Sequence, residues 1–313
     1  ESIIKSFVYD YIFPEVGFEN DSGPDNYYNS VSFDAILNLV WGRDLESGLQ
    51  NFRYQWTLSS ANPVGISTRA CTGGNEILVT PGTNEWVYSA AANGRPTTSG
   101  SHYLHVCIVD QVGNITKDSS RYYLDTSAPT GGSITYHHGY QIVEPIDIYV
   151  DPGSDPDSGL SQNNLDYVLE YRRAPLANNS CGGYVSWADA GVSETYDATE
   201  YEYIAEGGYC YQFRYKVKDN VGNETIYTST NVTRVDMVNP TAPTLSPASR
   251  DWHYTDVTVN FINAYDAHAG ISHYQYCSST ETTCIPDTTG GSATLTENGI
   301  YYVCAKSFDN AGR

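Results

Sequence analysis

Positive charge is scarce in this 313-residue chain, in which 16 lysines and arginines face 37 aspartates and glutamates, for a net charge of −21. This excess of negative charge repels nucleic-acid phosphates and acidic membrane surfaces, so we expect no nucleic-acid partner. Long apolar runs are lacking too: no stretch reaches the about 18 residues of a transmembrane helix, and we expect no membrane insertion. No signal-peptide pattern opens the chain, so we expect any secretion signal to be removed or to lie outside this segment.

Motifs for catalysis are lacking as well. The sequence has no Gly-x-Ser-x-Gly elbow, no His-Glu-x-x-His pair and no Gly-rich loop that would hold a phosphate. His102 and His105 are three residues apart on an expected strand and point to opposite faces, so they cannot share a metal ion. We therefore predict that the protein is not an enzyme and has no catalytic residues.

Helical periodicity is the third absence, because no stretch repeats apolar residues at i, i+3, i+4 and i+7. Short β-branched and aromatic runs, separated by clusters of Gly, Asn, Asp, Ser and Pro, take its place at residues 31–41, 146–150, 209–217, 257–262 and 300–304. Aromatic residues make up 13% of the chain, and a Tyr on a half-buried strand packs its ring while its hydroxyl stays in water. We predict an all-β protein of sandwich domains.

Three landmarks recur in the same order along the chain. Asp-x-x-x-Pro begins at Asp10, Asp125 and Asp236. Asp-x-x-(Ser/Ala)-Gly-(Leu/Ile) begins at Asp44, Asp155 and Asp266, a constant spacing of 111 residues. Asp-(Gln/Asn)-(Val/Ala)-Gly follows an aromatic strand and begins at Asp110, Asp219 and Asp309. This internal repeat predicts domains at 11–124, 125–235 and 236–313, with residues 1–10 as a terminal strand of a preceding repeat or as a donor strand.

Each repeat is interpreted as a sandwich in immunoglobulin order. An apolar strand (31–40, 142–150 or 257–262) leads into the Asp-x-x-Ser-Gly turn, where Gly supplies a positive φ. A Tyr-rich strand follows, and a later strand ends in Asp-Asn-x-Gly, which is a tight hairpin signal. We expect these strands to be B, C and F, with the two Asp motifs as the B–C and F–G loops.

The segments 303–312 and 124–130 resemble the immunoglobulin-like repeats of large bacterial cell-surface and adhesin-type proteins. The likeness extends over essentially the whole chain, apart from longer insertions in the first two repeats. The resemblance implies tandem immunoglobulin-like β-sandwich domains arranged as an elongated rod, extracellular, at a cell surface or in a secreted filament. The leading function is then structural: a segment or subunit of a surface filament, stalk or coat, with neighbouring copies or repeats of the same protein as partners.

A second function would use the aromatic residues of the two insertions. Trp86 and Trp187, with several neighbouring tyrosines, would form a sugar-stacking surface in an adhesin or carbohydrate-binding module, whose partners would be glycans. Packing of these rings against the sandwich is the simpler interpretation of the same residues. The sequence leaves both functions open.

Cysteine placement favours an oxidising, extracellular environment, and each bridge would contribute about 2–4 kcal/mol. One cysteine per repeat lies on or beside the strand before the last Asp motif, and another lies in the variable region that precedes this strand. Matching them predicts three disulfides: Cys71–Cys107, Cys181–Cys210 and Cys284–Cys304. Cys277 is left over, and a Cys277–Cys284 bridge is the rival pairing in the third repeat. Zinc is the weaker interpretation, since no pair has Cys-x-x-Cys spacing.

No cofactor is required by the pattern, but calcium is suggested. In immunoglobulin topology the B–C and F–G loops share the end where the chain enters, so each incoming linker brings its aspartate towards two loop aspartates. The predicted triads are Asp10/Asp44/Asp110, Asp125/Asp155/Asp219 and Asp236/Asp266/Asp309, with Glu46 and Asp157 as extra oxygens. Three crowded carboxylates repel one another unless a hard cation or turn amides neutralise them. The alternative is that each Asp merely caps its own turn.

The two ends of the chain do not match. Residues 2–9 precede the first Asp-x-x-x-Pro as the last strand of a repeat precedes the second and the third. The chain stops at Arg313, where that strand of the third repeat would begin. Either the chain is an excerpt of a longer array, or residues 2–9 of one copy complete the third repeat of the next copy by strand addition.

Strand addition is testable by shortening the chain. If residues 2–9 fill the gap in the next copy, a chain that lacks residues 1–9 no longer assembles, because the edge of the third repeat finds no partner strand. Light scattering of the shortened and full-length chains measures the difference. Assembly that proceeds equally well without residues 1–9 would rule strand addition out.

Overall fold

The computed structural model describes residues 9–18, 27–29, 40–61, 63, 71–77, 85–88, 95–192, 195–248 and 252–313. In this part of the chain the regular structure is β-strand, apart from one 3₁₀ turn at Asn164–Asp166. The predicted all-β class is therefore confirmed. None of the described segments forms a helix long and apolar enough to cross a membrane.

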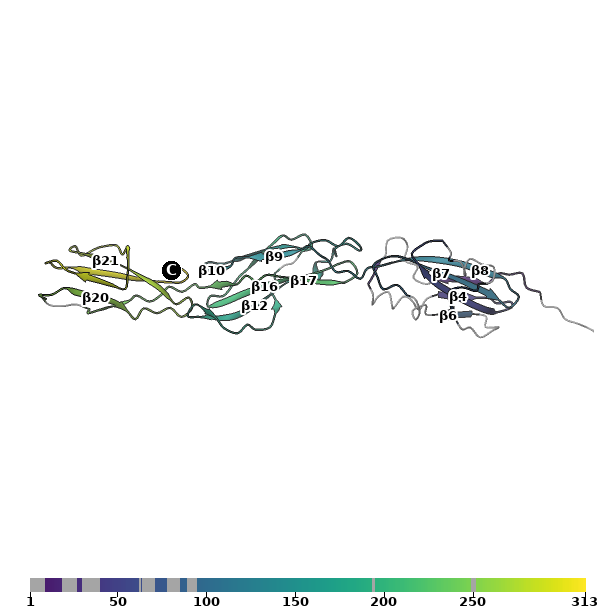
Figure 1. Ribbon diagram of the computed structural model, residues 1–313, viewed down its shortest axis with the longest axis horizontal. Helices are drawn as coiled ribbons and strands as arrows, with labels where there is room; N and C mark the ends of the chain where they lie inside the picture. The colour runs from purple at the N-terminus through teal and green to yellow at the C-terminus, as the bar shows by residue number, and fades with distance from the viewer. Residues whose placement is uncertain are drawn as a thin grey trace, which may run out of the picture. The chain divides into compact units, whose positions relative to one another are not determined.

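Two sheets form the first repeat. One has the order β1 (Glu15–Phe18), β3 (Val40–Arg43) and β6 (Glu85–Tyr88). The other has the order β2 (Tyr27–Tyr28), β8 (Ile115–Leu124), β7 (Gly100–Asp110), β4 (Leu49–Thr57) and β5 (Asn75–Ile77). Figure 1 shows β4, β7 and β8 of this sheet. One buried apolar cluster joins Val40 of the first sheet to Phe52 and Ile108 of the second, so the two sheets make a sandwich.

The second repeat is also a two-sheet sandwich. Its smaller sheet has the order β15 (Glu200–Tyr203), β11 (Ile146–Asp151) and β9 (Ser133–Tyr136). Its larger sheet has the order β10 (Gly139–Gln141), β18 (Thr233–Val235), β16 (Tyr209–Lys218), β12 (Tyr167–Ala177) and β13 (Ser180–Cys181), with β14 (Ala188–Asp189) on β12 and β17 (Glu224–Thr228) on β16. Aromatic rings fill the space between the sheets: the ring centroids of Tyr136 and Phe213 are 5.1 Å apart.

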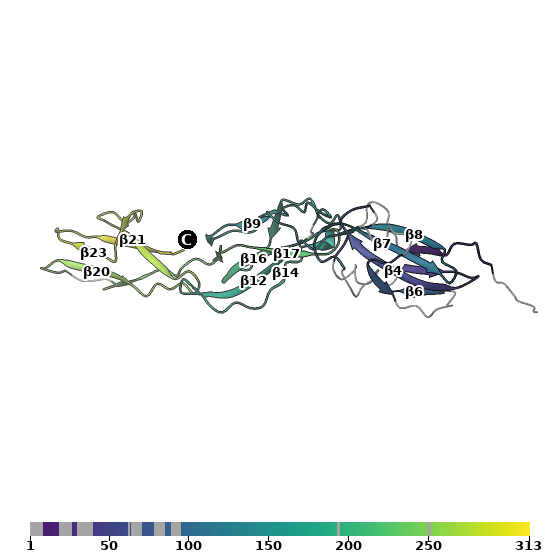
Figure 2. The ribbon, with the colours of Figure 1, turned by 45° about the vertical axis from the view of Figure 1, so that its right-hand side comes forward.

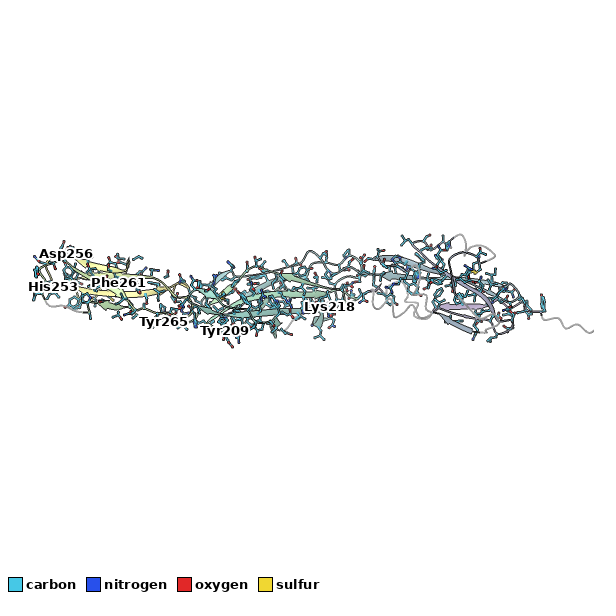
Figure 3. The ribbon with its side chains drawn as sticks, turned by 60° about the horizontal axis from the view of Figure 1, so that its bottom comes forward. Tyr209, Lys218, His253, Asp256, Phe261 and Tyr265 are labelled. Atoms are coloured by element: carbon cyan, nitrogen blue, oxygen red, sulfur yellow. A yellow bond between two sulfur atoms is a disulfide. The ribbon has the colours of Figure 1, made fainter. Side chains whose placement is uncertain are left out.

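The third repeat follows the same plan. One sheet has the order β19 (Thr244–Ser246), β20 (Val257–Ile262) and β23 (Ser292–Leu295), and Figure 2 shows β20 beside β23. The other has the order β22 (Thr288–Thr289), β21 (Ile271–Ser279) and β24 (Tyr302–Asp309). Phe261 on β20, labelled in Figure 3, packs against Tyr274 and Tyr276 of the other sheet.

One strand order is common to the three repeats and agrees with the predicted positions of strands B, C and F. The strand before each Asp-x-x-Ser-Gly turn is central in the smaller sheet (β3, β11 and β20), and the strand after it pairs with the strand that ends at the last Asp motif. In the first two repeats a short early strand pairs in parallel with a late one, β2 with β8 and β10 with β18. Of the predicted strand 31–40, only Val40 lies within the described residues.

The chain divides into two compact units. The first comprises residues 1–130, 154–162 and 218–224, and the second comprises residues 131–153, 163–217 and 225–313. Each strand pair in the described residues joins two strands of one predicted repeat. The boundaries 11–124, 125–235 and 236–313 stay predictions, and most of the expected donor strand lies outside the described residues.

Tyr211 fixes the corner that leads into β16. Its ring is fully buried, its hydroxyl donates to the carbonyl of Glu206 (3.1 Å), and the same hydroxyl accepts from the Glu206 N–H (2.9 Å). A Tyr whose hydroxyl bonds back to the backbone a few residues upstream is characteristic of this strand in immunoglobulin-like sandwiches. The ring is part of the core, and the hydroxyl provides hydrogen bonds for the N–H and the carbonyl of Glu206, which lies outside the strands.

Replacing Tyr211 by Phe tests the corner. The ring stays in place, but the backbone N–H and carbonyl of Glu206 lose their partner, so we expect the free energy of unfolding to fall by about 1–3 kcal/mol. Urea denaturation measures the change. Tyr254→Phe is the matched control, because Tyr254 is fully exposed and its loss of a hydroxyl should change stability by less than about 0.5 kcal/mol. Equal effects of the two substitutions would show that the corner hydrogen bonds contribute nothing.

Candidate metal centres

Three clusters of aspartates are formed from residues that are far apart in the sequence. The structure brings together Asp10/Asp44/Asp110, Asp125/Asp155/Asp219 and Asp236/Asp266/Asp309, and within each triad one carboxylate oxygen per residue lies within 4.8 Å of the others. These are the three triads that the sequence repeat predicts. In the third triad all three side chains are buried, and in the first two triads two of the three are.

The middle aspartate of each triad is held by the turn that it opens. In the first turn, Oδ1 of Asp44 accepts the N–H groups of Ser47 (2.8 Å) and Gly48 (2.6 Å). The same pattern recurs for Asp155 with the N–H groups of Asp157 and Gly159, and for Asp266 with those of His268 and Gly270. The glycine that closes the turn has a φ of +79°, +79° or +70°, a conformation that a residue with a Cβ adopts only with strain.

The last aspartate of each triad is held in the same way by the hairpin that follows its strand. Oδ1 of Asp219 accepts the N–H groups of Val221 and Asn223, both at 2.9 Å. Asp110 and Asp309 accept from the residues two and four positions after them. Turn capping therefore occurs at these positions, as the alternative interpretation of the sequence expects, and it accounts for one oxygen of each carboxylate.

The second oxygen of the middle aspartate has no such partner. Oδ2 of Asp44, Asp155 and Asp266 is buried and, within the described part of the chain, meets no hydrogen-bond donor. The same holds for Oδ2 of Asp10 in the first triad and of Asp309 in the third. A buried ionised oxygen needs a hydrogen bond or a countercharge, so capping alone leaves each triad uncompensated.

Asp219 in the second triad shows the effect of burial and of a neighbouring carboxylate. Burial raises the pKa of Asp219, and the nearby Asp125 carboxylate raises it further, while hydrogen bonds from Asn223 and Val221 act in the opposite direction. The potential metal ligands that face one another in each triad are all carboxylate oxygens. An all-oxygen, multiply charged set is the kind that Ca²⁺ prefers, so each triad fits a calcium ion.

Two asparagines that the sequence reasoning missed support the first two triads. The Asn223 amide donates to Oδ2 of Asp219 (2.7 Å) and to the linker carbonyls of Asp125 (3.2 Å) and Ser127 (2.9 Å). Asn114 occupies the equivalent place, donating to Oδ2 of Asp110 and to the carbonyl of Ile12. The signal was present as an Asn four residues after the last Asp in two of the three copies.

The third triad departs from this pattern because Arg313 stands where the others have Asn. Oδ2 of Asp309 is left without a donor, and the Arg313 guanidinium bonds instead to Oδ1 of Asn239 (3.0 Å) and to the carbonyl of Ile142 (3.1 Å). His268 adds a titratable group, with Nδ1 3.4 Å from Oδ1 of Asp236. Figure 3 shows Tyr265, the neighbour of Asp266, at the opposite end of β20 from His253.

Several other sequence-predicted residues lie outside the triads. Glu46 is exposed and Asp157 is half-buried, and neither belongs to a described cluster. Trp86 lies on β6, where only the backbone is described. Trp187 is half-buried, with the guanidinium groups of Arg172 and Arg214 each 4.6 Å from its ring centroid. Its ring is thus engaged within the domain, in agreement with the simpler interpretation.

The disulfides follow the predicted pairing in two repeats and depart from it in the third. Cys71 is bonded to Cys107 and Cys181 to Cys210, with Cα–Cα distances of 5.9 Å in both. The predicted Cys284–Cys304 bond does not form: Cys284 is bonded to Cys277, and Cys304 is free and exposed. The reason is the sheet order. β22 pairs with the edge of β21 that is opposite to β24, and Cys284 lies in the chain that leads into β22.

Comparison with family models and with curated proteins finds no match. Solved structures that resemble the chain include a 1.5-MDa bacterial ice-binding adhesin, with 11% identity over 96% of this chain and 87% of that chain and a TM-score of 0.34. The FN1–FN3 domains of chicken CNTN1 share 14% identity over 87% of this chain and 89% of that chain, with a TM-score of 0.27. Fibronectin(III)-like modules of Clostridium thermocellum CbhA share 11% identity over 71% and 93%, with a TM-score of 0.27. At these scores the likeness carries no argument about function.

Replacing Asn223 by Ala tests how the second triad is held. The change removes a donor from Asp219 and frees the linker carbonyls of Asp125 and Ser127, so we expect the free energy of unfolding to fall by about 1–3 kcal/mol. Thermal or urea unfolding measures it. Asn260→Ala, at an exposed position on β20, is the control and should have a small effect. If both variants unfold alike, Asn223 does not fasten the linker.

Proposed function

We propose that the chain is an extracellular structural protein, a segment or subunit of a surface filament, stalk or coat built from immunoglobulin-like repeats, and that its three aspartate triads bind calcium. Each ion would join one incoming linker to the two loops of the repeat that follows it. The linker supplies Asp10, Asp125 or Asp236, and the loops supply the other two carboxylates. A linker held in this way loses freedom of movement relative to its own repeat.

One observation carries the proposal: in all three triads, Oδ2 of the middle aspartate is buried without a hydrogen-bond donor among the described residues. Its partner oxygen Oδ1 is fully used by the turn. Asp44 and Asp266 are each only 3% exposed, so water compensates little of their charge. A calcium ion among the three carboxylates supplies the missing countercharge and takes the free oxygens as ligands.

Disulfide bonds support the extracellular part of the proposal. The Cys71–Cys107, Cys181–Cys210 and Cys277–Cys284 bonds would be reduced in most intracellular compartments, whereas they persist in an oxidising one. The partners that fit a repeated structural chain are neighbouring copies or repeats of the same protein. Glycan binding through Trp187 has less support, because two arginine side chains already cover its ring.

Replacing Asp266 by Asn distinguishes a role in calcium binding from a role in turn capping. Asn still accepts the two turn N–H groups through its side-chain oxygen, but it carries no charge. In a chelator we expect the variant to unfold at a higher temperature than the natural chain, because one of three repelling charges is gone. In calcium we expect the order to reverse, because a site at 100 times its Kd adds about 2.7 kcal/mol, and the variant lacks that site. Differential scanning calorimetry with and without calcium measures both.

Asp256→Asn is the matched control, since Asp256 is exposed and lies outside the triads. It should leave both unfolding temperatures unchanged. Titration calorimetry of the chelator-treated chain should show three sites, and two in the Asp266→Asn variant. No heat and no change in unfolding temperature at millimolar calcium would refute the calcium sites. A loss of stability that is equal with and without calcium would show that Asp266 only caps its turn.

A further inference from the structure

Three cysteines of the third repeat lie side by side on one sheet. In the antiparallel pair β21–β24, Cys277 is directly opposite Cys304. On the other side of β21, β22 pairs with Gln275 and Tyr276, and the chain that leads into β22 contains Cys284, which is bonded to Cys277. Cys277 therefore lies on the central strand, with a disulfide partner on one side and a free cysteine on the other.

The side chains of Cys277 and Cys304 point to the same face. Tyr276 and its register partner Ala305 pack into the core of the sandwich, so the next pair along the ladder, Cys277 and Cys304, faces outward. Directly opposed residues have Cα atoms about 4.5–5.5 Å apart, which falls within the range that a disulfide spans. Cys304 is exposed, whereas Cys277 is 9% exposed, so the neighbouring thiol reaches Cys277 more easily than an external thiol does.

We propose that Cys304 exchanges with the Cys277–Cys284 disulfide, so that the third repeat holds an internal thiol–disulfide relay. The Cys304 thiolate attacks Sγ of Cys277, a Cys277–Cys304 bond forms, and the Cys277–Cys284 bond breaks. The electron pair of the broken bond leaves on Sγ of Cys284, which takes up the proton that Cys304 gave up. No external oxidant or reductant is consumed, because the repeat holds one disulfide and one thiol before and after the step.

The exchange moves the reactive thiol from a strand to a loop. Before it, the Cys277–Cys284 bond closes a loop over residues 278–283, and the free thiol is on β24. After it, the bond ties β21 to β24, and the free thiol is Cys284, next to the exposed Ile285. The relay therefore adds Cys284 to Cys304 as a position that a thiol or disulfide reagent can modify.

The other two disulfides serve as internal controls. Cys71–Cys107 and Cys181–Cys210 account for the remaining cysteines of the sequence, and neither bond has a third cysteine in its own repeat. They should therefore keep one pairing under all conditions that leave disulfides oxidised. Exchange confined to the third repeat would distinguish the relay from general scrambling.

The relay is tested by alkylating the oxidised full-length chain with iodoacetamide, digesting it with pepsin in acid, where exchange is slow, and mapping labels and disulfides by mass spectrometry. We expect label on both Cys304 and Cys284, together with a Cys277–Cys304 peptide pair. Labelling of Cys284 should be faster at higher pH, because the thiolate is the attacking species in the exchange. Label on Cys304 alone, at every time and pH, would overturn the proposal.

Two variants complete the test. In Cys284→Ser we expect a Cys277–Cys304 disulfide after air oxidation. If Cys277 and Cys304 both remain free thiols, the relay is contradicted, whatever disulfide map the natural chain gives. In Cys304→Ser we expect only the Cys277–Cys284 bond and no labelled cysteine. Circular dichroism of each variant establishes that it is folded, and the Cys71–Cys107 and Cys181–Cys210 peptides of the same digests must remain unlabelled.

Discussion

Crowding of like charges where the chain enters each repeat is the constraint on which the rest of the structure depends. The carboxylates meet because the sheets bring two loops, far apart in sequence, to the end where the linker arrives. Backbone N–H groups take one oxygen of each loop aspartate, so each turn is stable by itself. One oxygen of each carboxylate lies within 4.8 Å of the other two, and the repulsion between the carboxylates couples three segments of chain. Whatever neutralises that repulsion acts on the linker and both loops at once.

The three centres share this arrangement of one linker aspartate and two loop aspartates, but they differ in the groups around the carboxylates. In the first two, an asparagine amide compensates part of the charge and fastens the linker at the same time. In the third, Arg313 bonds elsewhere, Asp309 keeps a free oxygen, and all three carboxylates are buried. The third centre therefore has the least aqueous surroundings, and like the first it has two buried carboxylate oxygens without a donor among the described residues.

The all-β class and the triads could be predicted from sequence because both depend on local signals. Alternating strands, and turns that need an aspartate and a positive-φ glycine, recur at fixed positions, and strand order then brings the aspartates together. The recurring Asn at position 223 is visible in the repeat, but its hydrogen bond to the Asp125 carbonyl could not be predicted, because that bond depends on where the linker lies in space. The predicted partner of Cys284 is wrong for a similar reason. Matching cysteine positions between the repeats does not reveal on which side of β21 the segment that contains Cys284 lies.

The parallel pairing of early and late strands has a mechanical consequence. In the first two repeats a strand near the start of the repeat lies parallel to one near its end, as β2 does to β8 and β10 to β18. A pull on the two ends of such a repeat draws these strands past each other along their length, so the hydrogen bonds between them are loaded together in shear. In an antiparallel pair that is pulled from one end, the hydrogen bonds between the strands would instead break one after another. Tension along the chain is thus shared between the hydrogen bonds of these strand pairs in the first two repeats.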